Sequence, residues 1–222
     1  MSRFVIAFAL VLSTSTAAFA APSQSFARPP VATTEVAPTD AAVAPVLDRA
    51  AIRAKLLENR LANLARFRGY QRQGVFPSNT YTSGLLNVWL DDAGHLCAAA
   101  TIIKASGDEA LVMQVARDDN FIRLADVTQG PLMDWILTSG LTQAEIVAIQ
   151  RPFANVGRPV QPVTFEQPVI VDSRLRAAED ARLAKLYRTI DATIVKHQRA
   201  SLELAVDRLM KNPALAAKLL RG

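Results

Sequence analysis

The stretch that decides the fold is residues 48–73, DRAAIRAKLLENRLANLARFRGYQRQ. Its apolar side chains recur at the three- and four-residue spacing of a helix. They are Leu57, Leu61 and Leu64 on one face, with Ile52, Leu56 and Phe67 beside it. Asp48 is a typical N-cap, and either Gly69 or Gly74 ends the helix. The stretch therefore predicts a long amphipathic helix at the start of a mainly helical fold.

The rest of the chain continues this helical pattern with one interruption. Residues 84–97, GLLNVWLDDAGHLC, predict two short strands, 87–90 and 95–97, around a D-A-G turn. Shorter helices follow, and two of them start at capping-box spacing, Ser106 with Glu109 and Thr142 with Glu145. The predicted fold class is mainly α with one small β-hairpin, arranged as a compact central helical domain plus a long C-terminal amphipathic helix.

The N-terminus has the pattern of a secretory signal peptide at residues 1–20. Arg3 precedes an apolar run at 4–12, and small residues stand at Ala18 and Ala20, so cleavage is expected after Ala20. The apolar run is too short to span a bilayer as a helix, and no later stretch approaches membrane-spanning length. We therefore expect an exported protein, periplasmic or secreted, with no transmembrane segment after signal cleavage.

Proline-rich stretches divide the rest of the chain. Residues 21–46 carry five prolines and few bulky apolar residues, which is typical of an extended linker. A second proline-rich stretch, the connector at 153–172, separates a central globular domain at 47–152 from a C-terminal helical segment at 173–222. The chain is thus predicted to contain one compact domain followed by a helical extension.

Charge is distributed unevenly around the net value of +5. Residues 48–73 carry seven basic and two acidic side chains, residues 74–172 five and eleven, and residues 173–222 eleven and five. The basic flanks therefore either pack against the acidic centre or face an anionic component of the cell envelope.

The C-terminal segment has an apolar stripe at helical spacing from about Ser173 to Lys211. A helix of this length needs a surface against which to bury its stripe. We expect that surface to be a partner protein, an anionic envelope component or a second copy of the chain. The predicted partner-binding residues are Leu183, Leu186, Ile190, Ile194, His197 and Leu209.

The chain has one cysteine, Cys97, and His95 stands two residues before it. On a strand the two side chains would point the same way, as a thiol nucleophile and its base require. The residues after Cys97 are strongly apolar, however, which favours a thiol buried as a small hydrophobic group. We predict no catalytic residue, and keep a small envelope hydrolase or thiol enzyme that uses Cys97 and His95 as the alternative.

Asp91, Asp92 and His95 form a second candidate, because clustered oxygen and nitrogen ligands can hold a metal ion. Their spacing matches neither a zinc motif nor a calcium loop, and D-D-A-G is an ordinary turn sequence. We predict that the chain holds no metal and no other cofactor, with these three residues as the alternative.

Residues 138–150, TSGLTQAEIVAIQ, resemble the turn and second helix of a helix-turn-helix. In that motif the residue four before the turn glycine is small, whereas Ile136 stands four before Gly140. The surrounding block is also acidic where a DNA-binding surface is basic. The prediction is a tight pair of helices and no nucleic-acid partner.

Three motifs of the central block resemble an uncharacterised group of exported bacterial proteins: D-x-x-G-x-L-C-A at 91–98, L-A-D-V at 124–127 and S-G-L-T-x-x-E-I at 139–146. The resemblance covers about residues 75–152 and implies a self-contained unit, with no substrate or catalytic residue. Together with the residues above, it predicts a non-enzymatic interaction module that uses a basic amphipathic C-terminal helix.

Overall fold

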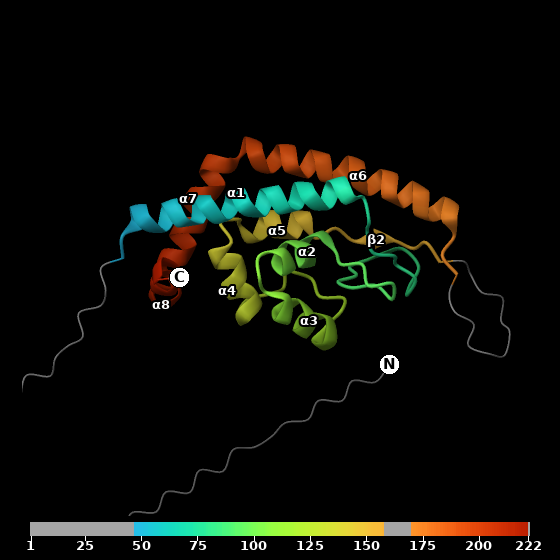
Figure 1. Cartoon of the computed structure of the whole chain (residues 1–222), viewed down its shortest axis with the longest axis horizontal. Helices are drawn as coiled ribbons and strands as arrows, with labels where there is room; N and C mark the ends of the chain where they lie inside the picture. Colours follow the sequence, from blue (N-terminus) through green and yellow to red (C-terminus); the bar gives the residue numbers. More distant parts are fainter. Residues whose placement is uncertain (1–46, 158–169, 222) are drawn as a thin grey trace, which may run out of the picture. The chain divides into compact units, whose positions relative to one another are not determined.

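The computed structural model describes residues 47–157 and 170–221, which belong to one compact unit. The predicted signal peptide, the predicted linker and most of the predicted connector lie outside the described residues. The described chain contains eight helices and two short strands (Figure 1). They are α1 Arg49–Gln73, β1 Leu85–Leu86, α2 Ala98–Ala105, α3 Glu109–Asp118, α4 Pro131–Thr138, α5 Gln143–Ile149, β2 Phe153–Ala154, α6 Ser173–Lys196, α7 Gln198–Met210 and α8 Pro213–Arg221.

The predicted fold class, mainly helical with one small β element, is confirmed. The paired strands are not the predicted ones, however. β1 and β2 run antiparallel with Leu86 opposite Phe153, so the small sheet joins segments that are far apart in the sequence. The predicted arms around the D-A-G turn meet at a single antiparallel bridge between Leu90 and Leu96.

Helix α1 contacts α2, α6, α7 and α8, and the other elements assemble around it (Figure 1). It begins at Asp48, whose carboxylate accepts hydrogen bonds from the amides of Ala50 and Ala51. It ends at Gly74, whose φ of 63° is the left-handed conformation of a helix C-cap. The predicted N-cap and the second of the two predicted end points are therefore confirmed.

The buried face of α1 differs in part from the predicted one. Leu61 is 52% exposed, and Arg60, a charged residue four positions from both Leu56 and Leu64, is completely buried. The other buried residues of this face are Ile52, Leu56, Asn63, Leu64, Phe67 and Tyr70. A charged side chain thus occupies the middle of the helix surface that faces the protein interior.

Two hydrophobic clusters hold the unit together. The larger joins α1 to residues 88–103, to α3, α4 and α5, and to α6. The smaller joins the start of α1 to α7 and α8, through Ile52, Leu56, Leu202, Ala205, Val206, Leu209, Leu215 and Ala216. Both clusters contain residues of the C-terminal segment. This segment therefore packs onto the rest of the unit, a question that the sequence leaves open.

The C-terminal segment is two helices rather than one continuous helix. α6 ends and α7 begins at His197, where the chain bends (Figure 1). The His197 ring Nδ1 lies 3.0 Å from the carbonyl oxygen of Thr193, which also accepts from the His197 amide. Both contacts satisfy the Thr193 carbonyl in the last turn of α6. The bend lets α6 pack into the larger cluster and α7 into the smaller one.

Candidate functional site

The structure gives Cys97 and His95, the two residues of the thiol alternative, different surroundings. Cys97 is completely buried and forms the N-cap of α2, where its Sγ accepts a hydrogen bond from the amide of Ala100 at 3.5 Å. Burial raises the pKa of the thiol to about 12, which keeps it protonated and unreactive near neutral pH. His95 is directed to Asp91 instead, with 3.1 Å between Nδ1 and Oδ2. Cys97 and His95 therefore do not form a nucleophile and its base.

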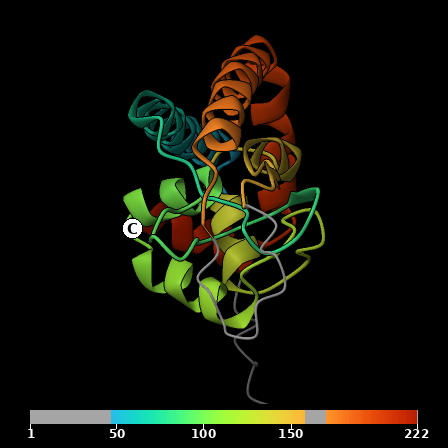
Figure 2. The same ribbon diagram turned by 90° about the vertical axis from the view of Figure 1, so that its right-hand side faces the viewer.

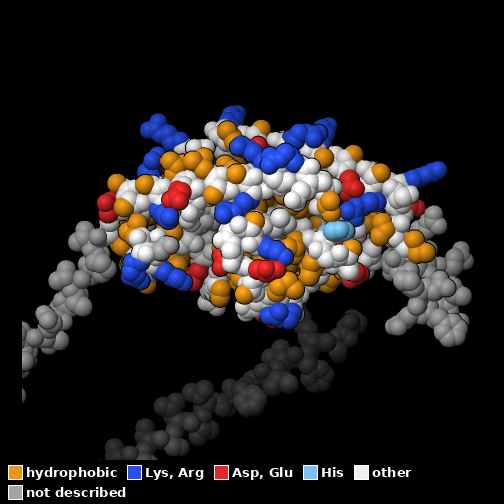
Figure 3. Space-filling view, in the orientation of Figure 1, with side chains coloured by type: hydrophobic (Ala, Val, Ile, Leu, Met, Phe, Trp, Pro, Cys, Tyr) orange, Lys and Arg blue, Asp and Glu red, His pale blue; other side chains and the backbone are white. Residues whose placement is uncertain are grey.

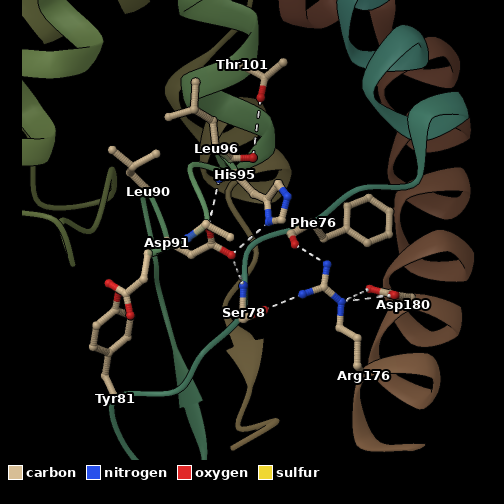
Figure 4. Close-up of polar contacts among 12 residues, drawn as sticks. Phe76, Ser78, Tyr81, Leu90, Asp91, His95, Leu96, Thr101, Arg176 and Asp180 are labelled. Carbon is tan, nitrogen blue, oxygen red and sulfur yellow. Dashed lines mark hydrogen bonds and ion pairs between the residues drawn. The ribbon is translucent and has the colours of Figure 1, made fainter. Parts of the chain in front are cut away.

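The Asp91 carboxylate stabilises the D-A-G turn by accepting hydrogen bonds from the backbone (Figure 4). It is buried and accepts hydrogen bonds from the backbone amides of Ser78 at 2.9 Å, Ala93 at 3.0 Å and His95 at 2.8 Å. On the far side of Ser78, Arg176 of α6 donates to the Ser78 hydroxyl and to a neighbouring carbonyl (Figure 4). These contacts tie the turn to the segment after α1 and to the start of α6.

The three residues of the metal alternative have separate hydrogen-bond partners within the described residues. Asp92 accepts a hydrogen bond from the Tyr81 hydroxyl at 2.9 Å, whereas Asp91 binds His95 and backbone amides. Burial and the contact with Asp92 raise the pKa of Tyr81 to about 12. No group of three or more His, Cys, Asp and Glu side chains is assembled in the part of the chain that the structure describes. Asp91, Asp92 and His95 therefore do not converge on a common centre.

The segment at 138–150 holds the end of α4, the turn and α5, and α4 and α5 form the predicted tight pair of helices. The Thr142 side chain and Glu145 form the predicted capping box at the start of α5. Gly140 in the turn has a φ of 76°, and a Cβ at this position would lie 2.0 Å from the carbonyl oxygen of Leu56 on α1. The turn is therefore pressed against the backbone of α1, and glycine is required there for space as well as for conformation.

A buried ion pair lies beneath this turn. Arg60 binds Glu145 through two hydrogen bonds, of 2.8 Å and 2.6 Å, and its guanidinium also donates to the carbonyls of Gly140 and Ile194. Burial acts to raise the pKa of Glu145, but hydrogen bonds from Arg60 and from the Thr142 amide outweigh it and hold the pKa below its ordinary value. Glu145 is therefore a carboxylate whose charge is matched inside the protein.

A groove of about 810 Å³ runs above this ion pair, between α5 on one side and α6 and α7 on the other. Figure 2 shows α5 beside α6. Its buried residues include Ile190, Ile194 and Ala205, whereas Leu186 is half-buried and Leu204 is 62% exposed. The other lining residues are Ile136, Leu137, Leu141, Thr142, Gln143, Ala144, Glu145, Ala148, Arg151, Thr189, Thr193, His197, Ser201, Asp207, Arg208 and Lys211.

The predicted partner-binding stripe is divided by the fold. Leu183 and Leu209 are completely buried in the two clusters, so they are not available to a partner, and the prediction is corrected for them. The other four predicted residues, Leu186, Ile190, Ile194 and His197, all line the groove. The sequence pattern identified one wall of the groove, but not α5, which forms the other.

Arginines of α1 form ion pairs mainly with acidic residues of α6 and α7, so these ion pairs join the two basic flanks. Arg49 and Arg53 of α1 bind Glu203 of α7, and Arg68 binds Asp191 of α6. Among the described residues, Arg60 is the one α1 side chain that forms an ion pair with the acidic centre. Figure 3 shows further Lys and Arg side chains along the edge of the described unit that α6 and α1 form.

The comparisons with known proteins find no matching family model, no matching curated protein and no matching solved structure. The resemblance of the central block to exported bacterial proteins therefore stays a prediction. Within the described residues, no helix is both long enough and apolar enough to cross a bilayer. The groove is the feature from which we propose a function.

Proposed function

We propose that the protein is an exported, non-enzymatic interaction module that binds a segment of a partner protein in the groove between α5 and α6–α7. The observation that carries this proposal is the groove itself, with an apolar floor and partly exposed apolar walls. Its walls are helices whose opposite sides are buried in the two clusters, so the surface is preformed. Preformed apolar grooves between helices are typical sites for an apolar face of a peptide or helix.

The polar groups of the groove support binding rather than covalent chemistry. The Glu145 carboxylate is already neutralised by Arg60, and the Nδ1 atom of His197 is hydrogen-bonded to the carbonyl of Thr193. The hydroxyl groups of Thr189, Thr193 and Ser201 are spread along the groove. Such groups fix the orientation and register of a ligand whose affinity comes from the apolar contacts.

A dye-binding experiment with two matched tryptophan variants tests the groove. Ala144 lines it and is exposed at the second position of α5, and Ala110 is exposed at the second position of α3, outside the groove. We expect the uncharged apolar dye Nile red to bind the native protein, Ala144→Trp to weaken binding by about tenfold, and Ala110→Trp to leave it unchanged. Equal dye binding by both variants would remove the groove from the proposal.

Export is part of the proposal and is supported by the signal-peptide pattern at residues 1–20. We expect the full chain, expressed in a bacterial host, to be found in the periplasm or medium with Ala21 as its first residue. Ala20→Leu, which places a bulky side chain at the cleavage site, should leave the unprocessed chain. A cytoplasmic, uncleaved wild-type chain, identified by fractionation and intact mass, would contradict export.

A further inference from the structure

Both ends of the groove carry positive charge that the described chain does not neutralise. Arg208 lies beside the start of α5, where it donates a hydrogen bond to the neutral Gln143 side chain at 3.0 Å, and Lys211 is one turn further along. Arg151 follows the opposite end of α5. Among the residues that the structure describes, none of these three cations forms an ion pair.

The acids in the groove are already matched to other partners. Glu145 is bound by Arg60, and Asp207 is bound by Arg49 at 2.7 Å. The Nε atom of Arg151 is also enclosed without a hydrogen-bond partner in the described part of the chain. Unmatched cations therefore flank the apolar middle of the groove at ends that are about 9 Å apart along α5.

We infer that the partner segment is an acidic amphipathic helix, with apolar side chains at helical spacing in the middle and carboxylates at both ends. Its carboxylates would lie opposite Arg151 at one end and Arg208 and Lys211 at the other, where guanidinium groups bind carboxylates in two-pronged geometry. This inference rests on the proposed function and specifies the chemistry of the partner.

Two observations favour a helix over an anionic lipid. A lipid with one head group would match the charge at one end of the groove and leave the other end unmatched. In addition, Leu186, Ile190 and Ile194 repeat every four residues along α6, which forms a ridge of the kind that packs into the surface of another helix. The groove therefore combines the shape and the charge pattern that suit a short acidic helix.

Three pools of fluorescein-labelled peptides test the inference by fluorescence anisotropy with the native mature protein. All the peptides have the same length and vary Leu, Ile, Val and Phe at the same apolar positions. The pools differ in the residues that flank this apolar middle about two helical turns apart, which are Glu, Gln or Lys. We expect the Glu pool to bind about tenfold more tightly than the Gln pool, the Lys pool to bind most weakly, and added salt to reduce these differences.

Charge-reversal variants assign the preference to the groove. Arg208→Glu and Arg151→Glu should each weaken binding of the Glu pool by about tenfold and strengthen binding of the Lys pool. Arg199→Glu is the matched control, because Arg199 is an exposed arginine of α7 that does not line the groove. It should change the affinity by less than about twofold. Circular dichroism checks that each variant retains the helical content of the wild type.

The outcomes separate this inference from the proposed function. One outcome is that Ala144→Trp blocks the binding of Nile red while the Glu pool binds no better than the Lys pool. In that case the groove remains a binding site, and the inference of an acidic partner helix is wrong. If Arg208→Glu behaves like Arg199→Glu, the inference is likewise overturned. Binding to phosphatidylglycerol vesicles without binding to the Glu pool would replace the protein partner with a lipid.

Discussion

The Arg60 guanidinium on α1 and the Glu145 carboxylate on α5 form a two-pronged ion pair inside the protein, with 2.6 Å between Nη2 and Oε1 and 2.8 Å between Nη1 and Oε2. The same guanidinium binds the carbonyls of Gly140 and Ile194, and so it joins α1, the turn between α4 and α5, and α6. A buried charge needs a counter-charge and hydrogen bonds, which Arg60 makes through Nη1 and Nη2, while its Nε has no partner in the described part of the chain. The pair therefore fixes how α5 lies against α1 and α6, and with it the width of the groove.

Breaking this pair should destabilise the protein strongly. Glu145→Gln leaves the Arg60 charge buried without a counter-charge, and we expect a loss of about 3–5 kcal/mol in the free energy of unfolding, measured by urea denaturation. The double variant Arg60→Met with Glu145→Leu removes both charges and should recover most of that loss. A change of less than about 1 kcal/mol in Glu145→Gln would show that the pair does not hold the fold together.

Acid should weaken the fold through the same carboxylate. The pKa of Glu145 in the folded protein lies below its ordinary value of 4.5, because hydrogen bonds from Arg60 and the Thr142 amide outweigh burial. A carboxyl group with a lowered folded-state pKa stabilises the fold above the unfolded-state pKa, and this contribution is lost as the pH falls through the folded-state value. The free energy of unfolding should therefore be steady near neutral pH and should decrease once the pH drops below 4.5.

Glu145→Gln serves as the control for this acid dependence. The variant should show a shallower fall of the unfolding free energy in the same pH range, because it lacks the titrating group. The pKa of Glu179 is also held below its ordinary value by Arg182 and by the Ala154 amide, which outweigh burial, so part of the slope should remain. Identical slopes in wild type and Glu145→Gln would contradict the assignment.

Gly140→Ala should be far more destabilising than Gly107→Ala. Both glycines have positive φ, which costs an alanine about 1–2 kcal/mol. A Cβ at Gly107 has nothing within 4 Å, whereas at Gly140 it meets the Leu56 carbonyl oxygen, which adds about 1–3 kcal/mol of overpacking. Thermal unfolding of the two variants measures the difference. Equal midpoints would mean that α1 does not press on the turn.

The Cys97 thiol should be protected in the native protein. With its pKa raised from 9.0 to about 12, its thiolate fraction at pH 8 is about a thousandfold below that of an ordinary cysteine, and burial restricts access further. We expect iodoacetamide to label it only after urea is added, as followed by mass spectrometry. Fast labelling without denaturant would contradict a buried, protonated thiol and favour the thiol-enzyme alternative.

Features that depend on nearby residues were predictable from the sequence. The Asp48 cap, the end of α1 at Gly74 and the Thr142–Glu145 capping box all form within a few residues of the chain. The other expected box failed, because Ser106 ends α2 instead of starting α3. Its hydroxyl donates to the carbonyl of Ile103 and accepts from the Trp135 indole, a contact with α4 that local spacing does not reveal.

Features that depend on distant residues were not predictable. β1 pairs with β2 across most of the central block, and the bend at His197 allows one apolar stripe to serve two clusters. Arg60 does carry a readable signal, since it occupies a stripe position of α1, but nothing local names Glu145 as its partner. The groove arises only when α5 is placed against α6 and α7, so the sequence indicated one wall and missed the other.

The smaller cluster joins the first helix of the described unit to the last two, and this sets the order in which a newly made chain can mature. Until α7 and α8 have been synthesised, Ile52 and Leu56 lack most of the apolar side chains that cover them in the folded unit. The smaller cluster can therefore pack only once α7 and α8 are present, whereas the larger cluster includes neither of these helices. We expect truncation of α7 and α8 to expose Ile52 and Leu56 and to lower the free energy of unfolding.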